Sequence, residues 1–357
     1  MAKRKNDNTE QSDPVQGVEG GGVDARRRAS AVAVKQLRKV HGDEVVQWMT
    51  SFHTSPRRII PTGSLALDSA LCVGGIVRGR IYEFFGPESG GKTTLALSTI
   101  REAQRLGGAA IFVDAEHALD MGLVLKMGID PDRLVLVRGY TGEQNLDMAE
   151  ALMATAEFDL CVIDSVAALQ PSAEANLKSF DDNTMGLQPR LMSRMCREFT
   201  PLVSRTGTGL ILINQIRANI GGYGKTETTS GGNAIRHHMS GRIRVTGGGV
   251  KSRAILNEKG DVIGHRAGFE VIKNKLGPPF RTAEADLIYG KGFSRSAELL
   301  DLGVQMGFID QAGSWFSYEG EKLGQGREKA MVTLEENEVI RTAVELGVSK
   351  VLGIVSE

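Results

Sequence analysis

The sequence predicts an α/β protein with a mostly parallel central sheet that is flanked by helices. Three observations predict it: short β-forming runs alternate with helical stretches, a glycine-rich turn joins the first run to the first helix, and polar residues stand where several runs end. Parallel strands covered on both faces have this pattern, and their carboxyl ends meet at one edge where ligands bind. The runs are GRIYEFF, GAAIFVD, RLVLVRG, FDLCVID and TGLILIN.

Composition sets few limits on function. The 357 residues are 41% hydrophobic and 24% charged, which is typical of a globular protein. No stretch of about 18 uninterrupted apolar residues is present, so the sequence excludes a membrane-spanning helix. The 43 basic and 43 acidic residues balance, so a nucleic-acid surface must concentrate its positive charge locally. Cys72, Cys161 and Cys196 fit no zinc or redox spacing and indicate reduced core thiols in a cytoplasmic protein.

The glycine-rich turn has the spacing of a P-loop and lies between a predicted strand and a predicted helix. Its backbone N–H groups form a nest for phosphate, to which the helix dipole adds. Lys92 is expected to reach the β- and γ-phosphates, and the Thr93 hydroxyl to bind Mg²⁺. The predicted nucleotide-binding residues are Gly86, Pro87, Glu88, Ser89, Gly90, Gly91, Lys92, Thr93 and Thr94.

Two carboxylates complete the predicted ATP site. The apolar run LCVID delivers Asp164 to a strand end, where a second metal residue is needed; the alternative is that Asp164 caps the next helix. FVDAEHALD places Glu116 just past another strand, and Glu116 is our choice for the group that activates water. His117 beside it is more often a structural residue.

The chain is expected to have four parts. Residues 1–27 form a disordered tail without apolar periodicity, and residues 28–55 form a helix with a linker that docks on the core or on a neighbouring subunit in polymerisation. The ATPase core is expected over 56–290. Residues 291–357 predict a small C-terminal α/β domain, with a hairpin around Glu319 and Gly320.

Collinear motifs make the resemblance specific. GPESGGKTTLAL, DAEHALD, VIDSVAAL, INQIR, ETTSGGNA, KNKL and GQG occur in the order that they have in the bacterial RecA recombinases, between about residues 55 and 330. The chain thus resembles that family, which implies a P-loop NTPase fold of RecA type.

The resemblance implies further site residues. Glu116 matches the catalytic glutamate, and Gln215 matches the glutamine that senses the γ-phosphate. Asp120 and Tyr289 lie where the family contacts adenine. Lys273 and Lys275 match a pair that reaches the ATP of the neighbouring subunit; read without the resemblance, they are ordinary surface lysines.

Two loops are expected to face DNA, at about 176–186 and 216–232. Arg190, Arg194 and Arg197 share one helical face after the first loop, although such a stripe alone is usually a solvated face. The second loop is rich in Gly and Thr and locally basic, which suits binding that is indifferent to sequence. By resemblance the DNA-binding candidates are Met185, Gly186, Arg190, Ser193, Arg197, Arg217, Thr228, Ser230, Gly231, Gly232 and Asn233.

The chain departs from the family pattern at a few positions. Gly90 replaces a serine of the P-loop, Leu123 stands where an adenine-stacking tyrosine is frequent, and His237 replaces a phenylalanine at subunit contacts. We expect a looser loop, weaker base selectivity and altered filament cooperativity.

The resemblance implies an ATP- and Mg²⁺-dependent recombinase of the cytoplasm that forms a helical homo-oligomer on single-stranded DNA and pairs it with homologous duplex DNA. A coprotease role toward a LexA-like repressor in the SOS response is a further expectation. The alternatives are a related repair accessory ATPase or ring helicase, and a small-molecule P-loop kinase. The lysine pair and the two loops favour the recombinase.

Overall fold

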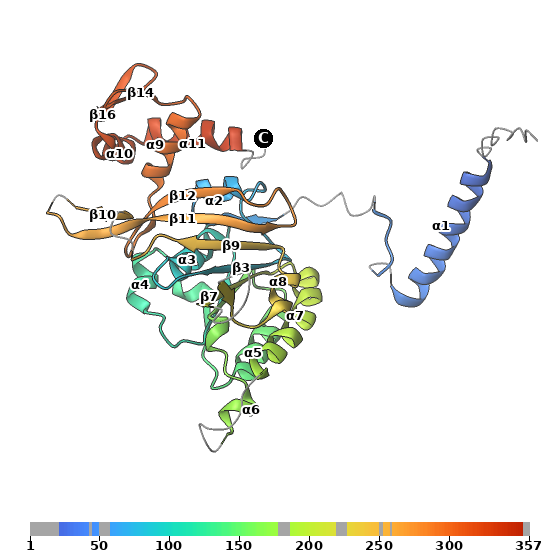
Figure 1. The fold of residues 1–357 in the computed structure, drawn as a ribbon. Coiled ribbons are helices and arrows are strands. Elements are labelled where there is room, and N and C mark those ends of the chain that lie inside the picture. Colours follow the sequence, from blue (N-terminus) through green and yellow to red (C-terminus); the bar gives the residue numbers. More distant parts are fainter. Residues whose placement is uncertain are drawn as a thin grey trace, which may run out of the picture. The chain divides into compact units, whose positions relative to one another are not determined.

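The computed structural model describes residues 21–42, 45–49, 58–177, 186–218, 227–249, 253–257 and 259–352. The chain divides into two units, Met1–Pro56 and Arg57–Glu357. In the first unit, α1 spans Gly21–His41 (Figure 1). Asp24 in its first turn and Arg38, Lys39 and His41 in its last turn suit the helix dipole. The helix begins seven residues before the predicted start, so 21–27 are helical rather than disordered, and residues 1–20 lie outside the described part.

The second unit is built on a long twisted sheet (Figure 1). Its strand order is β13-β12-β11-β9-β3-β7-β6-β4-β5, with β8 beside β7 and β10 beside β11. The bounds are β3 Ile81–Gly86, β4 Ala110–Asp114, β5 Leu134–Val137, β6 Leu160–Asp164, β7 Gly209–Ala218, β8 Glu227–Thr229, β9 Gly241–Thr246, β10 Ala254–Leu256, β11 Val262–Asn274, β12 Thr282–Ile288 and β13 Gly292–Phe293.

The sheet is mixed. From β9 through β3, β7, β6 and β4 to β5 the neighbours are parallel, whereas β11, β12 and β13 pair antiparallel. The reason is the length of the connections: β11 and β12 follow each other after a short turn, and only a longer crossover can bring the next strand in parallel. The predicted α/β class holds, but the parallel part is confined to one side of the sheet.

Alternating side chains divide the core between the two faces of the sheet. Phe84 and Phe112 pack on one face with α2 (Leu65–Ala70) and α3 (Lys92–Arg105). Ile111 and Ile163 point to the other face, toward α5 (Gly142–Ala154) and α7 (Leu187–Thr206). Because both faces are covered, these strands are mostly apolar, with the buried and paired Glu83 in β3 as an exception, and the polar residues of the site lie at their ends. Shorter elements connect them: β1 Ile59–Ile60, β2 Ile76–Val77, α4 Met121–Lys126, α6 Ser172–Ala175 and α8 Asn233–His238.

The C-terminal part has a core of its own. It comprises α9 Arg295–Gln305, β14 Asp310–Ala312, β15 Trp315–Tyr318, β16 Glu321–Gln325, α10 Arg327–Glu336 and α11 Glu338–Leu352. The predicted hairpin is confirmed: Tyr318 pairs with Glu321 across a two-residue turn in which Glu319 and Gly320 have φ of 49° and 86°. The small C-terminal α/β domain agrees with the predicted fold class, and its boundary at 290/291 stays a prediction.

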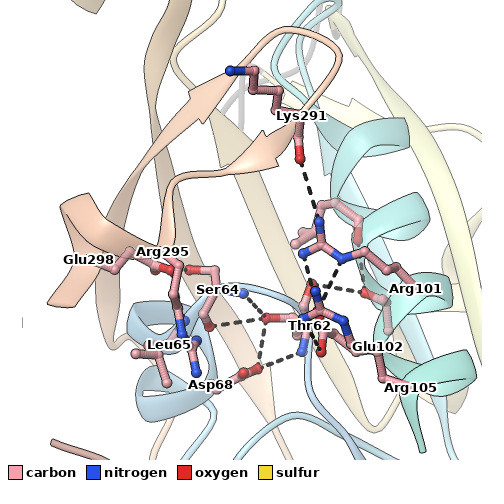
Figure 2. A network of polar contacts seen from close by, with 12 residues as sticks. Thr62, Ser64, Leu65, Asp68, Arg101, Glu102, Arg105, Lys291, Arg295 and Glu298 are labelled. Carbon is pink, nitrogen blue, oxygen red and sulfur yellow. Dashed lines mark hydrogen bonds and ion pairs between the residues drawn. The ribbon is translucent and has the colours of Figure 1, made fainter. Parts of the chain in front are cut away.

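A buried polar network joins the C-terminal part to the core (Figure 2). Glu298 of α9 accepts hydrogen bonds from the Ser64 hydroxyl (2.6 Å) and from the backbone N–H groups of Leu65 and Ala66, at the start of α2. Asp68 accepts from the backbone N–H (2.9 Å) and the hydroxyl (2.7 Å) of Thr62. Burial raises the pKa of both carboxyls, Asp68 well above its ordinary value, and the hydrogen bonds oppose the rise.

The raised pKa of Asp68 predicts that the protein loses stability as pH rises. Between the ordinary pKa and the raised one the folded state binds the proton more tightly, so the free energy of unfolding is higher below this window and falls through it. Asp68→Asn keeps the acceptor oxygen and removes the titration. We expect the melting temperature of the wild type to fall by roughly 2 °C more than that of the variant as pH rises from the ordinary carboxyl pKa to neutrality. Equal pH dependence in the two proteins contradicts the assignment.

Candidate functional site

The glycine-rich turn forms an anion-binding nest. Strand β3 ends at Gly86 and α3 begins at Lys92, with Gly91 as its N-cap at φ 95° and Ser89 at φ 57°. These left-handed residues turn consecutive N–H groups toward one point, and the N-terminus of α3 faces the same point. The nest fits a phosphate group.

A neighbouring segment presses directly on this turn. A Cβ added to Gly86 would lie 2.0 Å from the carbonyl oxygen of Val245, and one added to Gly248 would lie 1.7 Å from that of Ser89. The end of β9 and the residues after it therefore fix the position of the turn through backbone contact. The sequence did not indicate this contact.

Lys92 is folded into the turn. Its Nζ donates to the carbonyl oxygens of Gly86 (3.1 Å) and Pro87 (2.6 Å), and the residue is only 8% exposed. Burial lowers the pKa of Lys92, while Asp164, Glu116 and Glu88 oppose the fall. A buried ammonium group held by carbonyl dipoles suits a ligand with strong negative charge.

Thr93 and Asp164 meet at the carboxyl edge of the sheet. The Thr93 hydroxyl donates to Asp164 Oδ2 at 2.6 Å. The strand register also brings a second carboxylate close to Asp164, because Asp114 at the end of β4 lies opposite Asp164 at the end of β6. Burial raises the pKa of Asp164 to about 6, with Glu116 and Asp114 adding to the rise and Thr93 and Lys92 opposing it.

This acidic edge fits Mg²⁺. Burial and neighbouring acids destabilise the charged form of the Asp164 carboxylate, and a bound cation stabilises it. Within the described ranges no three Asp, Glu, His or Cys side chains gather into a metal cage. Mg²⁺ is usually bound by one or two protein oxygens together with substrate phosphates, so Thr93 and Asp164 suffice.

Glu116 lies between two polar partners. Its Oε1 accepts a hydrogen bond from the Ser165 hydroxyl (2.5 Å) and a longer one from Gln215 Nε2 (3.4 Å). Gln215 is opposite Gly86 in the β3–β7 register, so it stands beside the start of the phosphate turn. The structure thus brings Glu116, Gln215 and Asp164 to one place. Ser165 was missed, although its position directly after Asp164 was a usable signal.

Arg138 was also missed. It follows β5, and its guanidinium donates to Asp114 Oδ2 from Nε (2.9 Å) and from Nη2 (2.7 Å). The sequence could have indicated this role, because a basic residue follows directly after an apolar strand that ends at the same sheet edge. His117, by contrast, is exposed in a left-handed turn at φ 55°, with no sign of a chemical role.

A cavity of about 370 Å³ lies beside the phosphate turn. Tyr289 lines it together with the residues from Ser89 to Thr94, and so do His265 and Leu287, which are opposite each other in the β11–β12 pair. The His265 ring lies 5.8 Å from that of Tyr289, and burial lowers its pKa, so it is a neutral wall of the cavity. The cavity suits a planar base.

The structure does not bring Asp120 to the cavity. Its carboxylate caps α4 by accepting from the Leu123 N–H at 2.8 Å. Leu123 is half-buried and packs against the core. The role of Asp120 in adenine binding stays a prediction, and a structural role is sufficient to explain its presence.

Comparison with known proteins decides the family. The model of the RecA N-terminal domain matches residues 28–294, and that of the RecA C-terminal domain matches 297–353. The chain belongs to the RecA family. It is 44% identical to Protein RecA of Desulforapulum autotrophicum over 330 residues, which is 92% of this chain and 93% of that protein. It is 45% identical to Protein RecA of Mycobacteroides abscessus and of Sulfurovum sp., again over 92% of this chain and over 94% and 93% of theirs. The predicted family is confirmed, and the function is that of a RecA recombinase.

None of the helices in the described part of the chain has both the length and the hydropathy of a membrane span.

The lysine pair of this RecA-family chain lies away from its own phosphate turn. Strand β11 is antiparallel to β9, and β9 is parallel to β3, so the carboxyl end of β11 is at the edge opposite Gly86. Lys273 is near that end and Lys275 is just beyond it. The Lys273 ammonium donates to the carbonyl oxygens of Arg236 (2.5 Å) and His237 (3.0 Å). Burial and the neighbouring Lys275 lower the pKa of Lys273.

The structure describes the first predicted DNA loop only on its helical side. Gly186 caps α7 at φ 83°, and Arg190 and Arg197 are exposed on that helix, with Ser193 half-buried between them. Arg194 is instead engaged with Glu198 at 2.9 Å. Met185 and most of the first loop lie outside the described residues.

The second DNA surface begins where β7 pairs with β8, at Arg217 opposite Thr228. Gly231 and Gly232, at φ 86° and 78°, lead to Asn233 at the exposed start of α8. Asn214 ties the end of this segment to the sheet by donating to the Ser230 carbonyl at 2.9 Å. The side chain of Arg217 and residues 219–226 lie outside the described part.

Gly248→Ala should weaken nucleotide binding. The new methyl group cannot lie 1.7 Å from the Ser89 carbonyl, so the phosphate turn must move. We expect the Kd for a fluorescent ATP analogue to rise about tenfold, as a displacement near 1 Å warrants. Gly209→Ala is the control, because its Cβ meets its nearest neighbour at an ordinary 3.4 Å. Unchanged binding in Gly248→Ala contradicts the contact.

Proposed function

We propose that the chain binds and hydrolyses Mg-ATP while polymerised on single-stranded DNA, and that it pairs this DNA with a homologous duplex. The observation that carries the proposal is the position of Gln215. Its side chain reaches Glu116 in the ATP site, and its strand continues into the pairing with β8 that begins the second DNA loop. One residue therefore touches both halves of the activity.

The ATP site supports hydrolysis by positioning and electrostatics. The N–H groups of the turn and Lys92 bind the β- and γ-phosphates. Thr93 and Asp164 are the residues that would hold Mg²⁺, which supplies neutralisation of phosphate charge when bound. Glu116, oriented by Ser165, holds the attacking water and accepts its proton.

Lys273 and Lys275 act on the ATP of a neighbouring subunit. Their place at the sheet edge opposite Gly86 supports this, because it separates them from the phosphate turn of their own chain. In a head-to-tail polymer the two opposite edges meet. The ammonium groups then neutralise charge in the transition state as an arginine finger does.

Binding of DNA depends on the local positive charge of the two loops. Arg190 and Arg197 face solvent on α7, and the Gly- and Thr-rich second loop offers N–H and hydroxyl donors to phosphates. Contacts to phosphates carry no sequence information, so base pairing is left to identify the homologous strand. We place this activity in the cytoplasm, and a LexA-like repressor as partner stays a prediction.

The test combines two measurements on the full chain. ATP turnover is measured with and without single-stranded DNA, and the same samples are imaged by electron microscopy. A RecA-type mechanism requires both DNA-stimulated turnover and helical filaments. A repair accessory ATPase or helicase gives rings or no polymer, and turnover that ignores DNA sinks the proposal.

Gln215→Ala should separate ATP binding from DNA stimulation. The residue is not among those that line the nucleotide cavity, so we expect the Kd for ATP to change less than about twofold. DNA-stimulated turnover should fall to the DNA-independent level, since the contact with Glu116 is lost. Stimulation of wild-type size in the variant would falsify the coupling.

A further inference from the structure

Arg138 reaches the catalytic loop from outside the nucleotide site. It lies one residue after β5 and crosses to the end of β4, where it binds the Asp114 carboxylate through two nitrogens. Its Nη2 also donates to the carbonyl oxygen of Leu119 at 3.1 Å. The guanidinium therefore contacts both ends of the loop 115–119, which carries Glu116.

The Asp114 side chain also binds the end of that loop. Its carboxylate accepts from the N–H groups of Ala118 (3.0 Å) and Leu119 (3.2 Å). At the start of the loop, the N–H groups of Ala115 (2.9 Å) and Glu116 (3.4 Å) donate to the Asp164 carbonyl. The loop is thus fixed at its start by β6 and at its end by Asp114, with the Glu116 side chain between these anchors.

The Asp114 carboxylate needs a cation to hold this position. Its side chain is only 3% exposed, and it lies close enough to Asp164 to raise the pKa of that carboxyl. Without the guanidinium, the buried Asp114 carboxylate keeps a charge that lies opposite the Asp164 carboxylate and has lost its cation, so the side chain is expected to move. This movement weakens the hydrogen bonds to Ala118 and Leu119. The position of Glu116 therefore depends on Arg138.

We infer that Arg138 is a positioning residue for ATP hydrolysis, which acts through Asp114 and the loop 115–119 to hold Glu116 where water is activated. The inference rests on the proposed role of Glu116. Arg138 is not among the residues that line the nucleotide cavity, so its effect belongs to the rate of hydrolysis and not to nucleotide affinity.

Arg133 provides a matched control at the other end of β5. Its Nε donates to Asp130 at 2.8 Å and its Nη1 to the Gln104 carbonyl at 2.9 Å. The side chains of Arg133 and Arg138 are 41% and 40% exposed. Arg133 thus makes the same kinds of contact at the same exposure, without reaching the loop of Glu116.

The experiment measures DNA-stimulated ATP turnover of the full-length chain at saturating DNA, for Arg138→Gln, Arg138→Lys and Arg133→Gln. For Arg138→Gln we expect kcat to fall about tenfold or more, part of the 10²–10⁴ that a positioned base supplies, while KM for ATP stays within about twofold. Arg138→Lys should recover part of kcat, because it restores the charge without the two-nitrogen contact. Arg133→Gln should stay within about twofold of the wild type in both constants.

A second series in the Glu116→Gln background separates positioning from general damage. If Arg138 acts through Glu116, Arg138→Gln lowers the residual single-turnover rate of Glu116→Gln by less than about twofold. An equal proportional loss in both backgrounds overturns the inference, as does an equal loss in Arg133→Gln or a change in KM alone. Circular dichroism checks that each variant is folded. If Arg138→Gln is not folded, the kinetic constants of Arg138→Lys are used to test the inference.

The outcomes also distinguish the inference from the proposed function. If Glu116→Gln abolishes DNA-stimulated turnover while Arg138→Gln keeps the wild-type kcat, the inference fails and the proposed function stands. If Glu116→Gln turns over ATP at the wild-type rate, the role proposed for Glu116 fails, and the inference that rests on it fails as well.

Discussion

The structure depends on a balance of charge at one buried edge of the sheet. Register brings the ends of β4 and β6 together, so Asp114 and Asp164 lie side by side, with Glu116 close by. Lys92 approaches from the phosphate turn, and Arg138 approaches from β5. Burial makes the charges of Asp114, Asp164 and Lys92 costly without partners, and burial together with the neighbouring acids raises the pKa of Asp164 to about 6. The metal ion and the nucleotide phosphates supply opposite charges that complete the balance, so the site is arranged to favour the loaded state.

The mixed topology of the sheet supports the proposal that one chain serves two ATP sites. The parallel strands direct their carboxyl ends to the phosphate turn, whereas β11 runs the opposite way and directs Lys273 to the other edge. The phosphate turn lies at one edge of the sheet and the lysines lie at the other. In a two-fold symmetric contact the same edge of both subunits meets, so the lysines of one subunit could not reach the phosphate turn of the other. Contacts between opposite edges are heterologous and generate an open helical polymer when they do not close. In the role proposed for Lys273, the antiparallel half of the sheet serves catalysis as well as the fold.

The sequence predicted features that form within one short segment, and it did not predict contacts between residues that are far apart in the chain. The strand-turn-helix at Gly86 to Thr93 is specified within one segment, and Glu116 follows from its place after an apolar run, whereas Gln215 was assigned by resemblance. Arg138 and His265 could not be assigned, because their contacts with Asp114 and Tyr289 depend on strand order. The antiparallel half escaped for the same reason, since β runs do not reveal their direction. The expectation for Asp120 rested on resemblance alone; the structure shows its cap on α4, and its role toward adenine stays a prediction.

The coupling proposed between ATP and DNA requires one mobile contact beside a rigid one. Asn214 is fully buried and donates to Glu83 and to the Ser230 carbonyl, both at 2.9 Å. Glu83 in turn pairs with Arg242, whose guanidinium lies 4.6 Å from the Phe85 ring, so this chain of contacts is locked into the core. Gln215, the next residue, is half-buried and makes a long 3.4 Å contact with Glu116. Spatial continuity alone does not establish a pathway, which needs an element with two arrangements. Asn214 cannot be that element without leaving buried groups unsatisfied, whereas Gln215 can turn from Glu116 to a γ-phosphate at little cost. In the proposed coupling, Gln215 therefore moves its own side chain while the strand stays in place, and the pairing of β7 with β8 is where we propose that this movement reaches the second loop.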